Sequence, residues 1–198
     1  MIRLALAALL AAPAAFAATY NIDAAHSSAN FTIKHMMVSK VNGHFKSVKG
    51  SVDFDEARPD ATAVNAEIDA SSIDTNDAKR DGHLKTPDFF DVAKYPTITF
   101  KSTKVTSTGA NKFSVLGDLT LHGVTKEVTL DVEGFDQALN TPWGTVKRGG
   151  TASTTIRRKD FGLIWQKQLD KGGVMLGDDV KIVIDLEMDA KGAEKAAK

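Results

Sequence analysis

The chain has 198 residues, of which 42% are hydrophobic and 25% charged, and it contains no cysteine. This composition excludes a disordered, collagenous or coiled-coil protein, because such chains are poorer in apolar residues or carry an obvious repeat. The 25 basic and 25 acidic side chains balance, so no strong net field favours nucleic acid as a partner. We expect one globular domain that folds without disulfides.

The first 17 residues have the pattern of a secretory signal peptide. Arg3 precedes the apolar run LALAALLAAPAAFA, which ends in the small-x-small sequence Ala15-Phe16-Ala17. The alternative, an uncleaved anchor, is disfavoured because the run is short and alanine-rich for a bilayer core of about 30 Å. The sequence therefore predicts cleavage after Ala17 and a mature chain outside the cytoplasm.

From residue 18 onward, apolar and polar residues alternate, which predicts β-strands with one buried face. In the first run, Ala29, Phe31 and Ile33 alternate with polar residues, and at least eight such runs follow one another along the chain. Composition does not distinguish a sandwich from a closed barrel. A barrel leaves no exposed strand edges, and an eight-stranded barrel has room for one slender ligand.

The region around residues 76–92 breaks this alternation and predicts a short helical insertion. Thr75 or Asn76 is the expected N-cap of the helix. The two phenylalanines that follow, Phe89 and Phe90, are expected to cover apolar surface at one end of the β structure. The residues after 190 are small and charged, so we expect 191–198 to form a flexible tail.

Four blocks of the sequence occur together in a known family. They are TYNIDAAHSSANFTIKH, RDGHLKTPDFFDVAKYPTITFKSTKV, GDLTLHGVTKEVTLDV and RRKDFG, in this order. Between residues 19 and 188 the chain thus resembles the YceI-like family of periplasmic polyisoprenoid-binding proteins. The resemblance divides the chain into a signal peptide (1–17), a YceI-like lipid-binding barrel (18–190) and the tail.

The resemblance implies an all-β fold, an extended eight-stranded antiparallel barrel of lipocalin-like type. Its pore would hold the isoprenoid chain of a polyprenyl lipid or a quinone-like amphiphile, in the periplasm and without catalytic activity. The implied function is binding, storage or transport of this amphiphile. The resemblance also suggests a homodimer and transient contact with a membrane or a membrane enzyme.

Strand parity predicts which side chains line the interior. A polyisoprenoid is long and almost wholly apolar, so it needs a continuous apolar tunnel with a few polar groups at one mouth. The expected tunnel residues occupy inward strand positions or belong to the helical insertion, and they are Phe31, Ile33, Phe54, Phe89, Phe90, Phe100, Val115, Leu119, Leu130 and Ile184.

A second set of residues is expected at the polar end of the tunnel. A charged or quinonoid head group must remain where water or fixed donors solvate it. His35 ends an inward-facing run, and Arg80, Asp81, Arg158 and Asp160 lie on segments that could meet at the barrel mouth. We expect Arg80 to anchor an anionic head. The alternative is that these charges form ion pairs holding the helical insertion to the rim.

The histidines leave a metal-dependent enzyme open as a different class of function. No H-E-x-x-H or H-x-H sequence brings two of them onto one element, and no G-x-S-x-G or cysteine nucleophile is present. We therefore expect no catalytic residue, metal or cofactor. A third hypothesis is a scavenger of hydrophobic xenobiotics or fatty amides that uses the same tunnel. The histidines are His26, His35, His44, His83 and His122.

Overall fold

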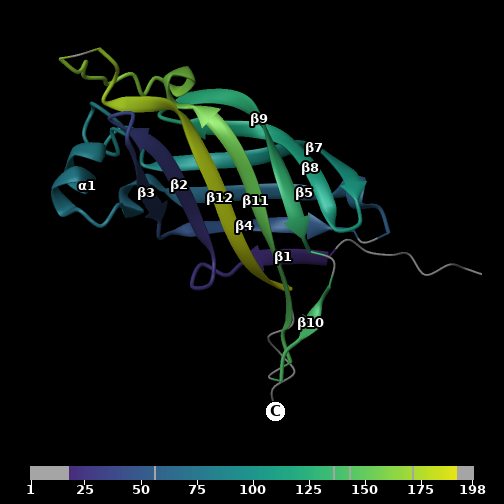
Figure 1. Cartoon of the computed structure of the whole chain (residues 1–198). Coiled ribbons are helices and arrows are strands. Elements are labelled where there is room, and N and C mark those ends of the chain that lie inside the picture. The colour runs from purple at the N-terminus through teal and green to yellow at the C-terminus, as the bar shows by residue number, and fades with distance from the viewer. Residues whose placement is uncertain (1–17, 56, 136, 143, 171, 191–198) are drawn as a thin grey trace, which may run out of the picture.

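Antiparallel strands make up most of the computed structural model, which describes residues 18–190 apart from residues 56, 136, 143 and 171 (Figure 1). The signal peptide and the C-terminal tail predicted from the sequence lie outside the described residues. The strands are β1 (Ala18–Ile22), β2 (Ser28–His35), β3 (Ser39–Phe45), β4 (Val48–Phe54), β5 (Ala63–Asp69), β6 (Ile73–Asp74), β7 (Thr97–Gly109), β8 (Lys112–Leu121), β9 (Val124–Gly134), β10 (Leu139–Asn140), β11 (Val146–Arg157) and β12 (Leu176–Ala190).

Eight of these strands form a closed ring. Their order is β11-β9-β8-β7-β5-β4-β1-β12, and β12 pairs with β11 over residues 179–189 to complete the circle. All pairings in the ring are antiparallel. The predicted eight-stranded antiparallel barrel is confirmed, and closure leaves the ring without an exposed edge.

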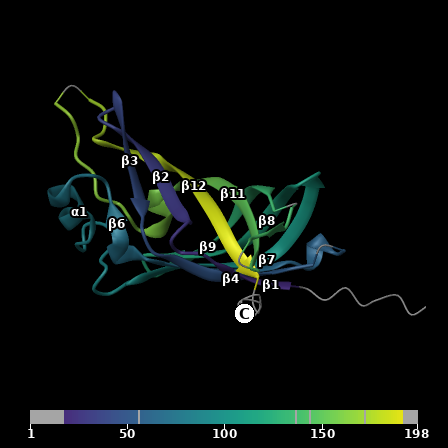
Figure 2. The ribbon, with the colours of Figure 1, turned by 90° about the horizontal axis from the view of Figure 1, so that it is seen from below.

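The wall of the barrel extends beyond this ring on one side. β1 and β2 lie one after the other along the same edge of β12, where Ile22 pairs with Met188 and Ser28 with Asp185. β3 then pairs with β2, and the two-residue strand β6 pairs with the end of β3. The β2–β3 hairpin therefore projects past the ring, as Figure 2 shows.

The predicted helical insertion is confirmed as α1 (Ala78–Leu84), followed by hydrogen-bonded turns up to residue 95. The predicted N-cap is wrong: Asp77 caps α1, and its carboxylate accepts from two backbone N–H groups of the first turn. The side-chain hydroxyl of Thr75 is already bound to side chains of the helix, and Asn76 has a left-handed backbone with φ of 60°. Neither residue is therefore available to cap.

Short 3-10 helices connect several strands, namely η1 (Pro59–Ala61), η2 (Ala70–Ser72) and η3 (Arg158–Phe161). Together with α1 they are the helices of the described residues, and none of them reaches the length and hydropathy needed to span a membrane. α1, the tip of the β2–β3 hairpin and the described residues between η3 and β12 (162–170 and 172–175) lie at the same end of the barrel (Figures 1 and 2). We call this the α1 end.

Candidate ligand-binding cavity

A cavity of about 400 Å³ lies inside the barrel. Strands from all around the ring contribute to its wall, as do β2, β3 and the segment that contains α1. Most of the lining side chains are aliphatic or aromatic. This volume is within the range of about 300–1,000 Å³ that is typical of small-molecule sites.

All the residues expected to line the tunnel do line this cavity. They are Phe31, Ile33, Phe54, Phe89, Phe90, Phe100, Val115, Leu119, Leu130 and Ile184. Phe100 and Val105 both line it although they differ in parity, because a bulge between Ser102 and Lys104 shifts the register of β7. Contact of these residues with a ligand stays a prediction.

Two of the wall phenylalanines lie over glycines of the neighbouring strand. Phe31 is the register partner of Gly43, and the ring of Phe100 lies against Gly117 of β8. A Cβ atom at either glycine would collide with the phenylalanine ring. The absence of a side chain at these glycines therefore makes room for the aromatic wall.

The residues expected at the polar end separate into two groups. His35, Arg80 and Arg158 line the cavity, whereas Asp81 and Asp160 do not. Among the described residues, the lining groups that carry a charge or an imidazole are those three and His83, and all four belong to elements at the α1 end. The role of these residues toward a head group stays a prediction.

Arg80 and Asp81 both bind Thr75, which follows β6 and is buried. The Arg80 guanidinium donates from Nε to the Thr75 hydroxyl at 2.7 Å and from Nη2 to its carbonyl at 2.6 Å. Asp81 accepts from the backbone N–H and the hydroxyl of Thr75, at 2.9 and 2.5 Å. This network joins α1 to the end of β6 and holds the Arg80 side chain at the cavity.

Arg158 is 3% exposed and is surrounded by acceptors from the segment that leads into β12. It donates to the carbonyl oxygens of Gly177, Leu163 and Trp165 at 2.9, 2.5 and 2.8 Å. Its Nη2 lies 3.3 Å from the Asp178 carboxylate. Burial lowers the pKa of Arg158, and Asp178 opposes this effect. Arg158 therefore ties the backbone at Leu163 and Trp165 to the start of β12 at Gly177.

An aromatic cluster at the α1 end was not foreseen from the sequence. The ring of Trp165 lies 5.6 Å from that of His83 and 5.3 Å from that of Phe89, and the last two rings are 5.1 Å apart. All three side chains line the cavity. The cluster joins the segment after η3 to α1 and the turn that follows it. Strand alternation could not reveal this contact, because neither segment is a strand.

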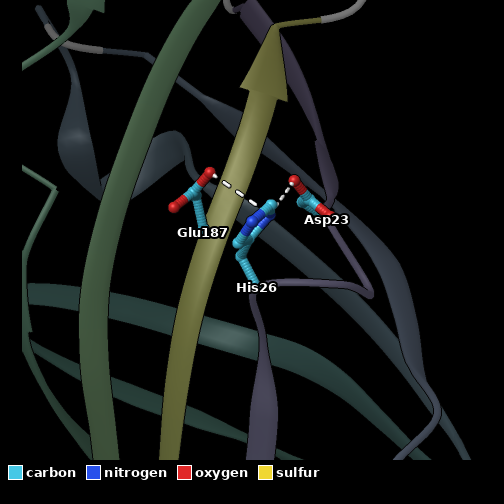
Figure 3. Close-up of side chains that lie close together, drawn as sticks. All are labelled: Asp23, His26 and Glu187. Carbon is cyan, nitrogen blue, oxygen red and sulfur yellow. Dashed lines mark hydrogen bonds and ion pairs between the residues drawn. The ribbon is translucent and has the colours of Figure 1, made fainter.

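The metal hypothesis has one candidate group within the described ranges, Asp23, His26 and Glu187, whose ligand atoms lie within 4.8 Å of one another (Figure 3). His26 Nδ1 lies 2.8 Å from Asp23 Oδ2 and 3.8 Å from Glu187 Oε1. The Lys147 ammonium also contacts both carboxylates, at 3.1 and 2.7 Å, and Asp189 at 2.9 Å. Because the Lys147 ammonium already pairs with the carboxylates, these residues form an ion-pair cluster. None of them lines the cavity.

A closed antiparallel barrel around an apolar cavity defines a hydrophobic ligand-binding barrel. The model of the YceI-like domain matches residues 20–188, and the chain belongs to this family. It is 40% identical over 182 residues to a UPF0312 protein of Azotobacter vinelandii, an alignment that covers 91% of each chain. The resemblance found in the sequence is confirmed.

Solved structures share the same barrel. BcnA of Burkholderia cenocepacia matches with a TM-score of 0.71 and 29% identity, over 84% of this chain and 98% of that one. A polyisoprenoid binding domain from Saccharophagus degradans, implicated in plant cell wall breakdown, matches with a TM-score of 0.61, over 88% and 99% of the two chains. At 18% identity, this second likeness is one of fold.

Proposed function

We propose that the protein acts in the periplasm, where it binds an amphiphile with a long isoprenoid chain and stores or carries it. The observation that carries this proposal is the apolar cavity, whose charged and imidazole lining groups gather at the α1 end. The name of the Saccharophagus degradans domain, which has the same fold, supports an isoprenoid as ligand. The signal peptide pattern of residues 1–17 supports export.

The energetics of burial favour such a ligand. Each methylene group removed from water contributes about 0.8 kcal/mol. Several isoprene units can therefore offset the entropy lost when a flexible tail is ordered. An isoprenoid chain also needs a carrier in an aqueous compartment, because its solubility in water is negligible.

The α1 end is where the head group would lie. His35, Arg80 and the cluster of His83 and Trp165 supply donors and ring faces there. An anionic head would pair with the Arg80 guanidinium, and a flat quinone ring would stack on the aromatic cluster. We assign binding to the cavity: Arg158 is held by backbone carbonyls, and Thr75 orients Arg80 by accepting from Nε and Nη2.

Native mass spectrometry and organic extraction of the protein purified from the periplasm test this proposal. We expect a long-chain amphiphile at one molecule per chain. Phe100→Glu should abolish its retention, because an unpaired charge in an apolar cavity is costly. Lys101→Glu is the matched control, since Lys101 is exposed on the same strand and should leave retention unchanged.

Three outcomes would contradict the proposal. A stoichiometric metal with no lipid would favour the metal-dependent alternative. An empty cavity that accepts many unrelated amphiphiles would favour a scavenger. A folded Phe100→Glu variant that still retains its lipid would show that the lipid lies elsewhere, and Phe31→Glu serves as the second variant if Phe100→Glu does not fold.

A further inference from the structure

The tip of the β2–β3 hairpin exposes apolar side chains to solvent. Met36, Met37 and Val38 are 42%, 52% and 86% exposed. They are consecutive, whereas the other large exposed hydrophobic side chains of the described residues, Leu139 and Ile164, each stand alone in sequence. We call Met36, Met37 and Val38 the apolar tip.

The backbone of this turn makes methionine an unusual choice. Val38 N–H donates to the His35 carbonyl at 3.2 Å, so Met36 and Met37 are the two central residues of a tight turn. Their φ angles are 49° and 64°. His35 pairs with Ser39, so Val38 completes a three-residue connection between β2 and β3. Positive φ at both central positions of a β-turn favours Gly, Asn or Asp, because other side chains are strained there. In the two-residue loop between β8 and β9, His122 and Gly123 also have positive φ, and the second of these residues is a glycine. The tip therefore retains apolar side chains at a cost to folding.

A second unfavourable feature lies directly below the apolar tip. Lys34 of β2 and Lys40 of β3 are opposite each other in the register, and both are exposed. Like charges placed directly opposite destabilise a strand pair. In the part of the chain that the structure describes, no ion pair joins either lysine to a carboxylate. An apolar tip above a pair of lysines suits the boundary of an anionic bilayer, where apolar groups insert and lysines meet the lipid phosphates.

We propose that the apolar tip and the Lys34–Lys40 pair dock the α1 end of the barrel on an anionic membrane surface. A second copy of the chain fits this surface less well, since a two-fold contact through the tip would bring two lysine pairs together. The tip is continuous with the cavity: His35, next to Met36, lines the cavity, and Met36 N–H donates to the Met175 carbonyl at 2.7 Å. Docking would therefore bring the α1 end of the cavity to the membrane. The docking step does not depend on the identity of the ligand.

Cosedimentation of the mature protein with lipid vesicles tests this inference. We expect binding to vesicles of phosphatidylglycerol and phosphatidylcholine, weaker binding at high salt, and little binding to phosphatidylcholine alone. The double variant Met36→Asn, Met37→Gly should bind roughly tenfold more weakly, because two apolar side chains no longer insert. Its stability should be equal or higher, since Asn and Gly tolerate the positive φ angles of these two positions better than methionine.

Two controls separate docking from other effects. Leu139→Asn removes an exposed apolar side chain on β10 and should leave vesicle binding unchanged. Lys34→Gln should weaken binding to anionic vesicles and reduce its dependence on salt. Equal vesicle binding by the wild type and the double variant would overturn the inference. A wild-type protein that does not bind anionic vesicles would also overturn it. Self-association that the double variant abolishes, without vesicle binding, would identify the tip as a contact between copies instead.

Discussion

At the scale of single residues, His26 and Asp23 form an interaction whose strength depends on pH. The hydrogen bond from His26 lowers the pKa of Asp23 from 3.8 to about 2, and the same bond raises the pKa of His26 above 6.5. Glu187 raises the pKa of His26 further, and Lys147 opposes this. Both groups are thus charged together over the range between these two pKa values.

The sign of the effect on stability follows from these shifts. The contribution of His26 is complete below pH 6.5 and is lost as pH rises through the raised pKa of the folded state. The contribution of Asp23 is present above pH 3.8 and is lost as pH falls toward 2. We therefore expect His26→Gln to flatten the decline of stability above pH 6.5, measured as denaturant midpoints across pH.

His44→Gln serves as the control, because the carboxylate that His44 acts on is Asp74 of β6, which is not part of this cluster. The effect of His26→Gln should be small, since the His26 side chain is 63% exposed and water screens the pair. Identical pH profiles for the wild type and His26→Gln would show that the contact with Asp23 does not persist in solution.

At the level of secondary-structure elements, a glycine-to-alanine substitution should lower the stability of the protein in one strand and raise it in the helix. A Cβ at Gly43 of β3 would collide with the ring of Phe31 and the methyl group of Thr75, whereas nothing lies within 4 Å of one at Gly82 in α1. We expect Gly43→Ala to lower the free energy of unfolding by about 1–3 kcal/mol through overpacking. Gly82→Ala should raise it by about 0.5–1 kcal/mol through helix propensity.

Chemical denaturation of the two variants measures this contrast. If Gly43→Ala were as stable as the wild type, Phe31 would have another position in the cavity wall. A Gly82→Ala variant that is strongly destabilised would mean that α1 packs more tightly than its exposed surface indicates. The contrast therefore tests the wall and the helix separately.

At the scale of the whole molecule, a ligand in the cavity should stabilise the entire barrel, because the ring closes on itself and β12 joins β11 to β1 and β2. A ligand at about 100 times its Kd stabilises the folded state by about 2.7 kcal/mol. For a chain of this size that corresponds to a rise in Tm of roughly 5–10 °C. Thermal unfolding with and without a polyprenyl phosphate measures the shift.

Arg80→Ala distinguishes the head group from the tail in the same measurement. The variant should lose more of the Tm shift with polyprenyl phosphate than with a hydrocarbon of equal length, because only the former has an anionic head. Equal losses of the Tm shift with both molecules would show that Arg80 has only a structural role, through its hydrogen bonds to Thr75.

Alternation in the sequence predicted most of the strands, the inward set from Phe31 to Ile184 and the place of the helical insertion, but it missed β1, since the first predicted run begins at Ala29. These predictions were possible because alternation follows from the covalent geometry of a strand, which places successive side chains on opposite faces. The family resemblance implied a barrel, whereas composition alone did not distinguish a barrel from a sandwich. Alternation indicates which face a side chain occupies, but not which strand lies beside it.

The closure of β12 on β11 required the folded structure, because that pairing depends on the curvature of the whole sheet. The structure also shows that the two arginines have different surroundings. Arg158 is enclosed by backbone carbonyls, whereas Arg80 lies at the cavity beside Thr75. The contact of His83 with Trp165 joins residues that are far apart in the chain and lie outside the strands. Such contacts form when loops meet at the end of a barrel, and local sequence patterns do not reveal them.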